Sequence, residues 1–457
     1  MNKLNTTLKQ TGIALAVAQA FVVNASSAAR ITVNDGGDAG AGCTFREAAA
    51  IVNAGSDQVN GCIIDTSNGP LGTNDTIEFN VVDDSVTLNS DSGAVLIDSD
   101  VSINTNGGAV TIAGDNASIG FRYDINGLLI IRDADVSIEN ATLTNGAAFY
   151  GGAGAVSVVS GSQLTLINTT IVDNVTLYGA GGIYVSASTI ILNNSTVSKN
   201  NSLASIGRGA GGILAIASSN VILSNSTVSG NSGISFGGIS SYRAGTVTLN
   251  NSTVSGNYGF FVGGIRSIEG MVTSNNSTVY GNSNTGIYTY RGTVTLNNSI
   301  IAGNRNDDVY GINSFASELD FTNSTLIANG NNLLGDNSET SESAFFGVTP
   351  SFANIIATSD GNNPTSLTNI LAPLADNGGP TLTHALVAGS PAINRGNNSI
   401  CAAAPINNLD QRGKRRPVGS NCDIGSFEGA LESATPEPET NFFVVSLPNG
   451  NSVIFSL

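Results

Sequence analysis

Short apolar segments recur along the whole chain. Most are four to six residues long, rich in β-branched residues, and bounded by Gly, Asn or Ser. Residues 211–229 show three of them in a row: Gly211-Gly-Ile-Leu-Ala-Ile, Asn220-Val-Ile-Leu and Ser226-Thr-Val-Ser. This spacing is typical of β-strands. No stripe with a 3.6-residue period runs through these segments, and Gly and Asn recur too often for helices. The pattern predicts an all-β protein.

The segments repeat as a unit between residues 140 and 330. Asn194-Ser-Thr-Val-Ser-Lys-Asn200 returns at 225–231, 251–257 and 276–282, and looser copies begin at Asn140, Asn168, Asn298 and Asn323, with a mean spacing of about 26 residues. Three short strands per repeat, each stacked on the next copy, make one coil of a parallel β-solenoid. Parallel crossovers are right-handed. We therefore predict a right-handed parallel β-helix with three strands per coil over residues 75–330, of about ten coils and roughly 50 Å in length.

The first Asn of each repeat has a predicted role in the turns. A sharp turn between strands needs a residue with positive φ, which Asn tolerates best after Gly. Stacked Asn side chains can also hydrogen-bond to one another as a ladder. We expect one inside corner to be lined by Asn168, Asn194, Asn225, Asn251, Asn276 and Asn298.

Composition and charge narrow the function classes. Only 11% of residues are charged, 55 are Gly, and Lys+Arg total 17 against 34 Asp+Glu, for a net charge of −17. A helical bundle or an average α/β enzyme is poorly compatible with this composition. So strong a negative field excludes nucleic acid as a partner and disfavours anionic membrane surfaces.

The N-terminus has the features of an export signal. Lys3 and Lys9 precede an apolar stretch at 12–23, which is too short to span a bilayer, and small residues at 25–29 offer a cleavage site. We predict a signal peptide over residues 1–29 and no transmembrane helix after it. The mature protein is expected to be extracellular, on the cell surface or associated with an outer membrane.

Four cysteines suit that oxidising compartment. Cys43 and Cys62 lie near the start of the chain, and Cys401 and Cys422 near its end. Local pairing, Cys43–Cys62 and Cys401–Cys422, is the simplest of three possible connectivities. Neither pair has the spacing of a zinc site, and His384 is the single histidine. We expect no metal and no cofactor.

Both ends of a solenoid need caps that cover the core. Residues 44–52 form the one credible short helix, within an N-terminal cap at 30–74. Residues 331–430 lose the repeat and gain Pro, Gly and Cys, as expected for a C-terminal cap. Residues 431–457 follow as a linker and two strand-like segments around Pro448-Asn-Gly-Asn, which predict a hairpin.

The ends resemble a known group of proteins. Cys43-Thr-Phe-Arg-Glu-Ala48 and Asp75-Thr-Ile-Glu-Phe79 are similar to the start of secreted bacterial proteins named for a Cys-Ser-Leu-Arg-Glu-Ala motif, although Thr44 and Phe45 replace Ser and Leu. Leu374-Ala-Asp-Asn-Gly-Gly-Pro, Asp410-Gln-Arg-Gly413 and Cys422-Asp-Ile-Gly-Ser-Phe-Glu428 resemble the choice-of-anchor Q domain. The resemblance implies a right-handed β-helix with polymorphic outer-membrane protein-like repeats and an exported life. It implies no defined reaction.

A β-helical enzyme that cleaves polysaccharides needs clustered carboxylates. Lyases of this kind bind Ca²⁺ with them, and hydrolases place two or three of them around one cleft. Acidic residues are sparse in the repeats, and only Arg305-Asn-Asp-Asp308 is compact. Asp307 and Asp308 are therefore weak catalytic candidates. A polysaccharide lyase or glycoside hydrolase remains the alternative interpretation.

Aromatic and arginine residues recur at nearby positions in three consecutive coils: Tyr242, Arg243, Arg266, Tyr288 and Arg291. Tyr rings stack on sugars, and Arg pairs with carboxylate or sulfate groups. We expect these residues to form a binding strip on one outer face. The sequence thus favours a structural, adhesive or glycan-binding module, rather than an enzyme, whose partner is an extracellular glycan or a surface protein.

Overall fold

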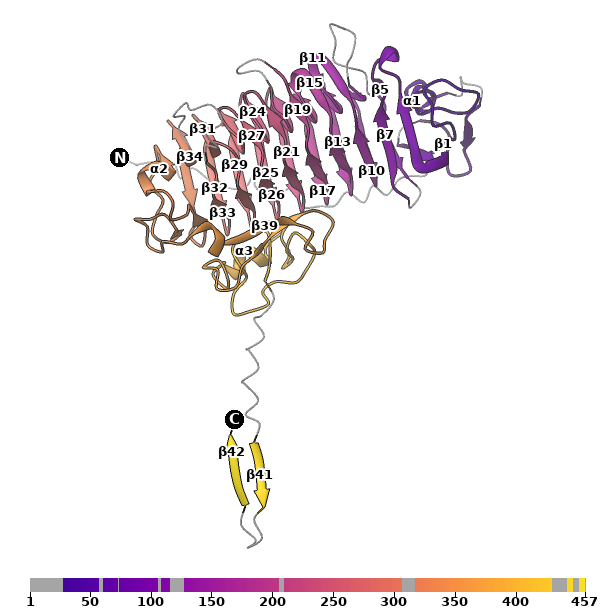
Figure 1. The fold of residues 1–457 in the computed structure, drawn as a ribbon. Helices are drawn as coiled ribbons and strands as arrows, with labels where there is room; N and C mark the ends of the chain where they lie inside the picture. The colour runs from indigo at the N-terminus through magenta and orange to yellow at the C-terminus, as the bar shows by residue number, and fades with distance from the viewer. Residues whose placement is uncertain are drawn as a thin grey trace, which may run out of the picture.

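The computed structural model describes residues 28–56, 61–72, 74–105, 108–115, 127–204, 209–305 and 317–429, with the strands at 442–446 and 452–456. The predicted signal peptide lies almost wholly outside these residues. Three long sheets, here called A, B and C, wind around one apolar core (Figure 1). Neighbouring strands within each sheet come from successive coils, so the chain forms the predicted parallel β-solenoid.

Sheet A has 12 strands in the described part of the chain, all parallel except the antiparallel pair β1 and β2. In spatial order they are β2 (Ile63–Asp65), β1 (Arg30–Val33), β3 (Asp75–Phe79), β6 (Val101–Asn104), β9 (Asp135–Glu139), β13 (Gln163–Ile167), β17 (Thr189–Asn193), β21 (Asn220–Ser224), β25 (Thr246–Asn250), β29 (Met271–Asn275), β32 (Thr293–Asn297) and β35 (Thr325–Ala328). The register is strict: Val221, Val247, Val272 and Val294 stack on one another inside the core.

Sheet B is built from the copies of the Ser-Thr-Val-Ser segment. Its strands are β4 (Ser85–Leu88), β7 (Val110–Gly114), β10 (Ala141–Thr144), β14 (Thr170–Val172), β18 (Thr196–Ser198), β22 (Thr227–Ser229), β26 (Thr253–Ser255), β30 (Thr278–Tyr280), β33 (Ile300–Ala302), β36 (Leu333–Leu334) and β38 (Ile355–Ile356). Solenoid pairing therefore continues to Ile356, beyond the boundary expected at residue 330.

Sheet C contains the Gly-Ile segments. Its strands are β5 (Val95–Ile97), β8 (Leu129–Arg132), β12 (Val156–Val159), β16 (Ile183–Ser186), β20 (Ile213–Ile216), β24 (Ile239–Tyr242), β28 (Ile265–Ile268), β31 (Thr285–Tyr290), β34 (Ser317–Thr322) and β37 (Phe345–Phe346). Five coils add a fourth strand, of two to seven residues, between sheets B and C, which the sequence did not predict. These strands form sheet D: β11 (Ala147–Ala153), β15 (Val175–Ala180), β19 (Asn201–Ser202), β23 (Ser232–Gly233) and β27 (Tyr258–Gly259).

The first Asn of each repeat adopts the predicted backbone conformation, with φ between 46° and 55° from Asn140 to Asn323. Its predicted inside position is wrong, however. Asn168 is exposed, and the side chains of Asn251 and Asn298 reach outward to the C-terminal cap. The residue after each Asn points inward instead, as the buried Ser252 does, because successive side chains alternate in direction.

The inside ladder is formed by the last Asn of each repeat. Each side-chain Nδ2 donates to the Oδ1 of its neighbour in the next coil, at 2.8–2.9 Å, and to a backbone carbonyl of the preceding coil. The ladder consists of Asn174, Asn200, Asn231, Asn257, Asn282 and Asn304, and all six are buried. At its end, Asn304 donates to Glu318 instead of another Asn.

Helix α1 (Phe45–Ala54) lies at the N-terminal end of the solenoid, where the cap was expected (Figure 1). A capping box between Thr44 and Glu47 starts it, and Gly55 ends it with φ 60°. Its apolar face, including Phe45, Ile51 and Val52, is buried against the first coils. The predicted Cys43–Cys62 disulfide beside it is confirmed.

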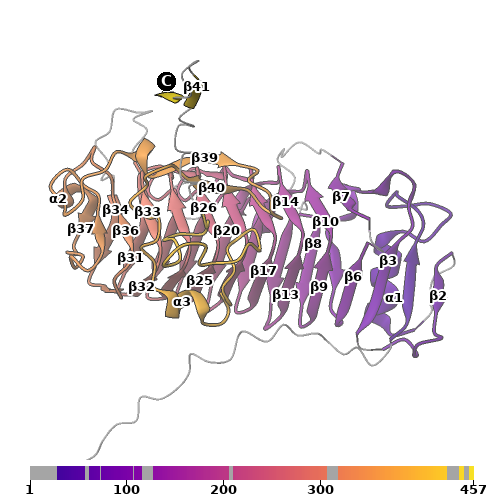
Figure 2. The same cartoon turned by 90° about the horizontal axis from the view of Figure 1, so that it is seen from below.

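The segment after the last coil does not simply cover the end of the solenoid. Its antiparallel strands β39 (Leu371–Ala375) and β40 (Thr383–Leu386) and helix α3 (Asn398–Ala402) lie along the outer face of sheet B (Figures 1 and 2). Gln411 Nε2 donates to Thr227 Oγ1 at 2.8 Å, and Thr253 Oγ1 donates to Gln411 Oε1 at 2.6 Å. The predicted Cys401–Cys422 disulfide is confirmed.

A few short elements complete the described structure. The single histidine, His384, lies on β40 of the cap and is buried against sheet B, with its Nε2 2.7 Å from Ser255 Oγ. In the tail, β41 (Phe442–Ser446) and β42 (Ser452–Ser456) pair antiparallel. The remaining helical segments are α2 (Ser341–Ala344) and three 3-10 turns at Val82–Asp84, Ser90–Ser92 and Leu367–Asn369. Of the helices in the described ranges, each is too short or too polar to cross a membrane.

Candidate functional site

The outer face of sheet C carries the aromatic and arginine residues identified in the sequence. Ser240, Arg266, Tyr288 and Asp320 are register partners in four successive coils and form one outward-facing row. Tyr242 lies two residues further along its strand than Ser240, and points to the same side. The structure thus places Arg266 and Tyr288 next to each other, with Tyr242 nearby.

Arg266 is held by aromatic rings on the surface. Its guanidinium carbon lies 4.4 Å from the ring centre of Phe236 and 5.8 Å from that of Tyr242, and its Nη1 donates to Ser240 Oγ at 3.2 Å. Cation–π contacts of this kind are favourable where water is partly excluded. Burial lowers the pKa of Arg266, but a guanidinium stays charged at neutral pH. The result is a preoriented cation, and Nη1 to Ser240 is its one side-chain hydrogen bond within the described part of the chain.

A groove opens beside Arg266, with a volume of about 280 Å³. Its wall comes from the segment before each Gly-Gly-Ile and its floor from sheet C. The lining residues, which define the sheet C groove, are Phe236, Phe260, Phe261, Val262, Arg266, Thr285, Tyr288 and Asp320. The rings of Phe260 and Phe261 meet edge to face at 5.0 Å, and Phe261 is 43% exposed. Exposed aromatic rings in a concave site are typical of ligand pockets.

Two further groups in the groove can form hydrogen bonds. Burial raises the pKa of Asp320 to about 6, so its carboxyl group is mostly ionised at neutral pH. Burial, and then the charge of Asp320, raises the pKa of Tyr288, so its hydroxyl stays protonated and can donate. The lining of the sheet C groove therefore includes one cation, one carboxylate and the hydroxyl groups of Tyr288 and Thr285, beside an aromatic wall.

The wall continues toward the N-terminus with smaller side chains. Ala180, Ala210, Phe236 and Val262 are stacked in register, and they pack with Leu214 of sheet C. All five side chains are buried, so they form a small apolar core behind the groove wall rather than an exposed surface. Leu203 and Ile234, which follow the register partners Ser202 and Gly233, are 41% and 44% exposed.

Arg243 and Arg291 lie outside the groove. Both have positive φ in the turn that follows their strands. Arg243 lies over the neighbouring Tyr242 ring at 5.3 Å, and Arg291 lies over Tyr290 at 5.0 Å and pairs with Glu269 at 3.8 Å. The predicted strip is therefore divided, with Arg266 and Tyr288 in the groove, Tyr242 beside it and two arginines at the sheet edge.

Asp307 and Asp308, the catalytic candidates, lie outside the described residues.

The sequence did not point to four of the groove residues: Phe236, Phe260, Phe261 and Asp320. Phe236 and Val262 occupy the position before each Gly-Gly-Ile, and Asp320 alternates with buried Leu319 and Phe321. Comparing equivalent positions between repeats could have found them.

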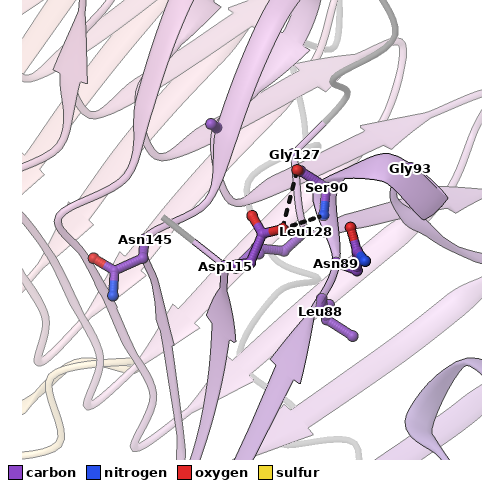
Figure 3. A pocket seen from close by; sticks show the side chains of 10 residues that line it. Leu88, Asn89, Ser90, Gly93, Asp115, Gly127, Leu128 and Asn145 are labelled. Carbon is purple, nitrogen blue, oxygen red and sulfur yellow. Dashed lines mark hydrogen bonds between the residues drawn. The ribbon is translucent and has the colours of Figure 1, made fainter. Parts of the chain in front are cut away.

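A second hollow lies near the N-terminal end, between Leu88, Ser90, Asp115 and Asn145 (Figure 3). Its volume is about 10 Å³, which is room for about one water molecule. Ser90 N and Oγ both donate to Asp115 Oδ2, at 3.1 Å each. This hollow is too small to be a ligand site.

Comparison with known proteins supports the β-helical fold. The model of a family described as a right-handed β-helix region matches residues 86–270. The fold is a right-handed parallel β-helix. Among solved structures, the β-helix is similar to a chain titled "Crystal structure of pectate lyase Pel9A", with a TM-score of 0.50, 16% sequence identity, and coverage of 89% of this chain and 98% of that one. At this identity the likeness extends to the fold alone. A comparison with curated proteins found no match.

Proposed function

We propose that this β-helix is an exported or cell-surface binding module that holds a linear glycan in the sheet C groove. The observation that carries the proposal is the position of Arg266, which lies fixed between aromatic rings beside an exposed aromatic wall. Aromatic faces stack on the apolar faces of sugar rings. A guanidinium with free donors can form paired hydrogen bonds with sugar oxygens or a carboxylate.

The shape of the groove suits a polymer more than a small molecule. Strands stack at ~4.8 Å, and the groove residues Arg266, Tyr288 and Asp320 follow three successive coils in register. A chain of sugars can therefore contact several coils at once. The net charge of −17 opposes strongly acidic polymers. Neutral or sparsely charged glycans fit best, since Arg266 and Asp320 balance each other locally.

Export is supported by the ends of the chain. The apolar stretch at 12–23 resembles a signal peptide, and both disulfides are of a kind that persists outside the cytoplasm. The N-terminal motif at 43–48 and the C-terminal motifs between 374 and 428 are similar to those of secreted Cys-Ser-Leu-Arg-Glu-Ala and choice-of-anchor Q proteins. A surface protein is the other partner class that suits such a module.

One observation favours the alternative, a polysaccharide lyase or glycoside hydrolase. A carboxyl group with a pKa of about 6, like that of Asp320, suits general acid–base chemistry at neutral pH. The fold shared with a pectate lyase is compatible with this activity. Within the sheet C groove, however, the charged residues are Arg266 and Asp320, whereas an enzyme of this class needs at least three converging acidic or basic groups. Binding is therefore the preferred function.

The test combines a glycan array with an assay for release of unsaturated sugars. For any glycan that binds, Arg266→Ser removes charge-assisted hydrogen bonds of ~1.5–3 kcal/mol, so affinity should fall about ten- to hundred-fold. Arg132→Ser is the matched control, because Arg132 projects from the same sheet at β8, far from the groove. Equal affinity of the two variants would refute the proposed site. Turnover that is lost in Asp320→Asn would establish the enzyme instead.

A further inference from the structure

The buried Asn ladder ends at a carboxylate. Glu318 on β34 occupies the place where the next Asn side chain would lie, and it is fully buried. Asn304 Nδ2 donates to Glu318 Oε2 at 2.6 Å, and the Asn304 backbone N–H faces both carboxylate oxygens at 3.2 and 3.3 Å. A glutamate in this position is not needed to close the ladder, since an Asn oxygen is the acceptor in the five earlier links.

Two more carboxylates converge on Glu318 from later segments. Asp336 follows β36 and Gly335, and Glu339 precedes α2. One carboxylate oxygen from each of Glu318, Asp336 and Glu339 lies within 4.8 Å of the other two. Asp336 is only 1% exposed. Three segments that are separate along the chain thus bring negative charge to one buried point.

The charges in this cluster are not balanced by the described residues. Arg305 Nη2 pairs with Asp336 Oδ1, and the Ser338 backbone N–H donates to the same oxygen at 3.0 Å. The buried Asp336 Oδ2 and Glu339 Oε1 have no hydrogen-bond partner within the described part of the chain. One arginine therefore faces three carboxyl groups. The unpartnered Oδ2 belongs to Asp336, a side chain that water hardly reaches, and it lies in this cluster. Ionising carboxyl groups at such depth is costly without a cation, and burial accordingly raises the pKa of Glu318 and of Glu339.

We propose that Glu318, Asp336 and Glu339 bind a calcium ion at the C-terminal end of the solenoid. Calcium binds carboxylate oxygens at ~2.4 Å, so ligands on opposite sides of the ion are ~4.8 Å apart. The three carboxylate oxygens lie within this distance of one another, as ligands of one calcium ion must. Magnesium, at ~2.1 Å, needs a tighter and octahedral set. Zinc favours nitrogen and sulfur ligands, which these residues lack.

The ion has a structural consequence that differs from glycan binding. It joins β34, the turn after β36 and the start of α2, which otherwise meet through a repulsive cluster. Because the core of a solenoid is open at its last coil, a cross-link at this point holds the final turns closed. The proposal is independent of the sheet C groove, because the residues that line the groove do not include Glu318, Asp336 or Glu339.

Calcium binding is measured by isothermal titration calorimetry at pH 7.5 on the protein stripped with a chelator. Glu339→Gln removes a half-buried ligand and should weaken calcium affinity about ten-fold or more, since even outer partners of a metal contribute that much. Glu342→Gln is the matched control, because Glu342 is exposed in α2 and carries the same charge. It should bind calcium as the unmodified protein does.

A second measurement identifies the site without relying on that variant. Tyr280 pairs in register with Ala302, two residues before Asn304, whose side chain donates to Glu318. Burial, and then the charge of Asp336, raises the pKa of Tyr280. Terbium bound in place of calcium should emit on tyrosine excitation, since the chain has no Trp. Calcium should displace it, and Tyr280→Phe should remove most of the emission while leaving calcium affinity unchanged. No calcium binding, or equal affinity in Glu339→Gln and Glu342→Gln, would overturn the proposal.

Discussion

Replacement of one Asn in the middle of the buried ladder should destabilise the whole solenoid strongly. The side chain of Asn257 makes four hydrogen bonds: its Nδ2 donates to Val228 O and Asn282 Oδ1, and its Oδ1 accepts from the backbone N–H and Nδ2 of Asn231, all at 2.9–3.0 Å. Asn257→Ala leaves buried groups of Asn231 and Val228 without partners. Each such group costs ~1–3 kcal/mol, so we expect a loss of about 3–6 kcal/mol.

The matched control is an Asn in a ladder that water can reach. Asn275 donates to Asn250 Oδ1 at 2.9 Å and accepts from Asn297 Nδ2 at 2.8 Å, on the outer face of sheet A. Water can replace these bonds, so Asn275→Ala should cost about 1 kcal/mol or less. The free energies of unfolding come from guanidinium titrations followed by far-UV circular dichroism. Similar losses for both variants would show that burial of the ladder does not determine its contribution.

Three other outcomes are expected. Burial disfavours the charged ring of His384 and lowers its pKa from 6.5 to about 4. The stability that the neutral ring contributes is therefore present above pH 6.5, and about 3 kcal/mol of it is lost as the pH falls to 4. The difference in unfolding free energy between the unmodified protein and His384→Gln measures this loss, and a pH-independent difference would contradict it. Asn251→Ala should cost about 1–3 kcal/mol through its positive φ and its lost bond to Leu409 O; Asn251→Gly should cost less, and equal losses in a denaturant series would show that backbone strain is negligible. Removal of the Cys401–Cys422 bridge by a double Ser substitution should cost ~3 kcal/mol in the same titrations, because it closes a loop of about 20 residues; unchanged stability would contradict the loop-closure account.

The repeat made the coil predictable, but not the direction of each side chain. The two Asn residues of a repeat, such as Asn251 and Asn257, recur with the same period, and either could line the core. Whether an Asn points inward depends on the turn between sheets A and B, where Asn251 takes positive φ and leaves the inward position to Ser252. Periodicity reports the turn but not which of its residues faces inward.

Contacts between distant segments were equally hidden. Nothing local to Gln411 indicates that its side chain is buried against Thr227 and Thr253, more than 150 residues earlier. The groove residues were hidden for the same reason: Phe236 and Asp320 come from different parts of a repeat and line one groove only when the coils stack. Arg266 and Tyr288 could be identified because they occupy equivalent positions in neighbouring coils.

The position of the C-terminal cap has a consequence for how the length of this molecule can change. Each coil contacts only its neighbours, so inserting or deleting a whole coil preserves every other coil. The cap is fastened to sheet B at Thr227, Thr253 and Ser255, and the sheet C groove lies in the same coils. A coil added between β10 and β18 would lengthen the rod and move both units together. The length of the solenoid can therefore change in steps of ~4.8 Å while the groove and the cap keep their structure.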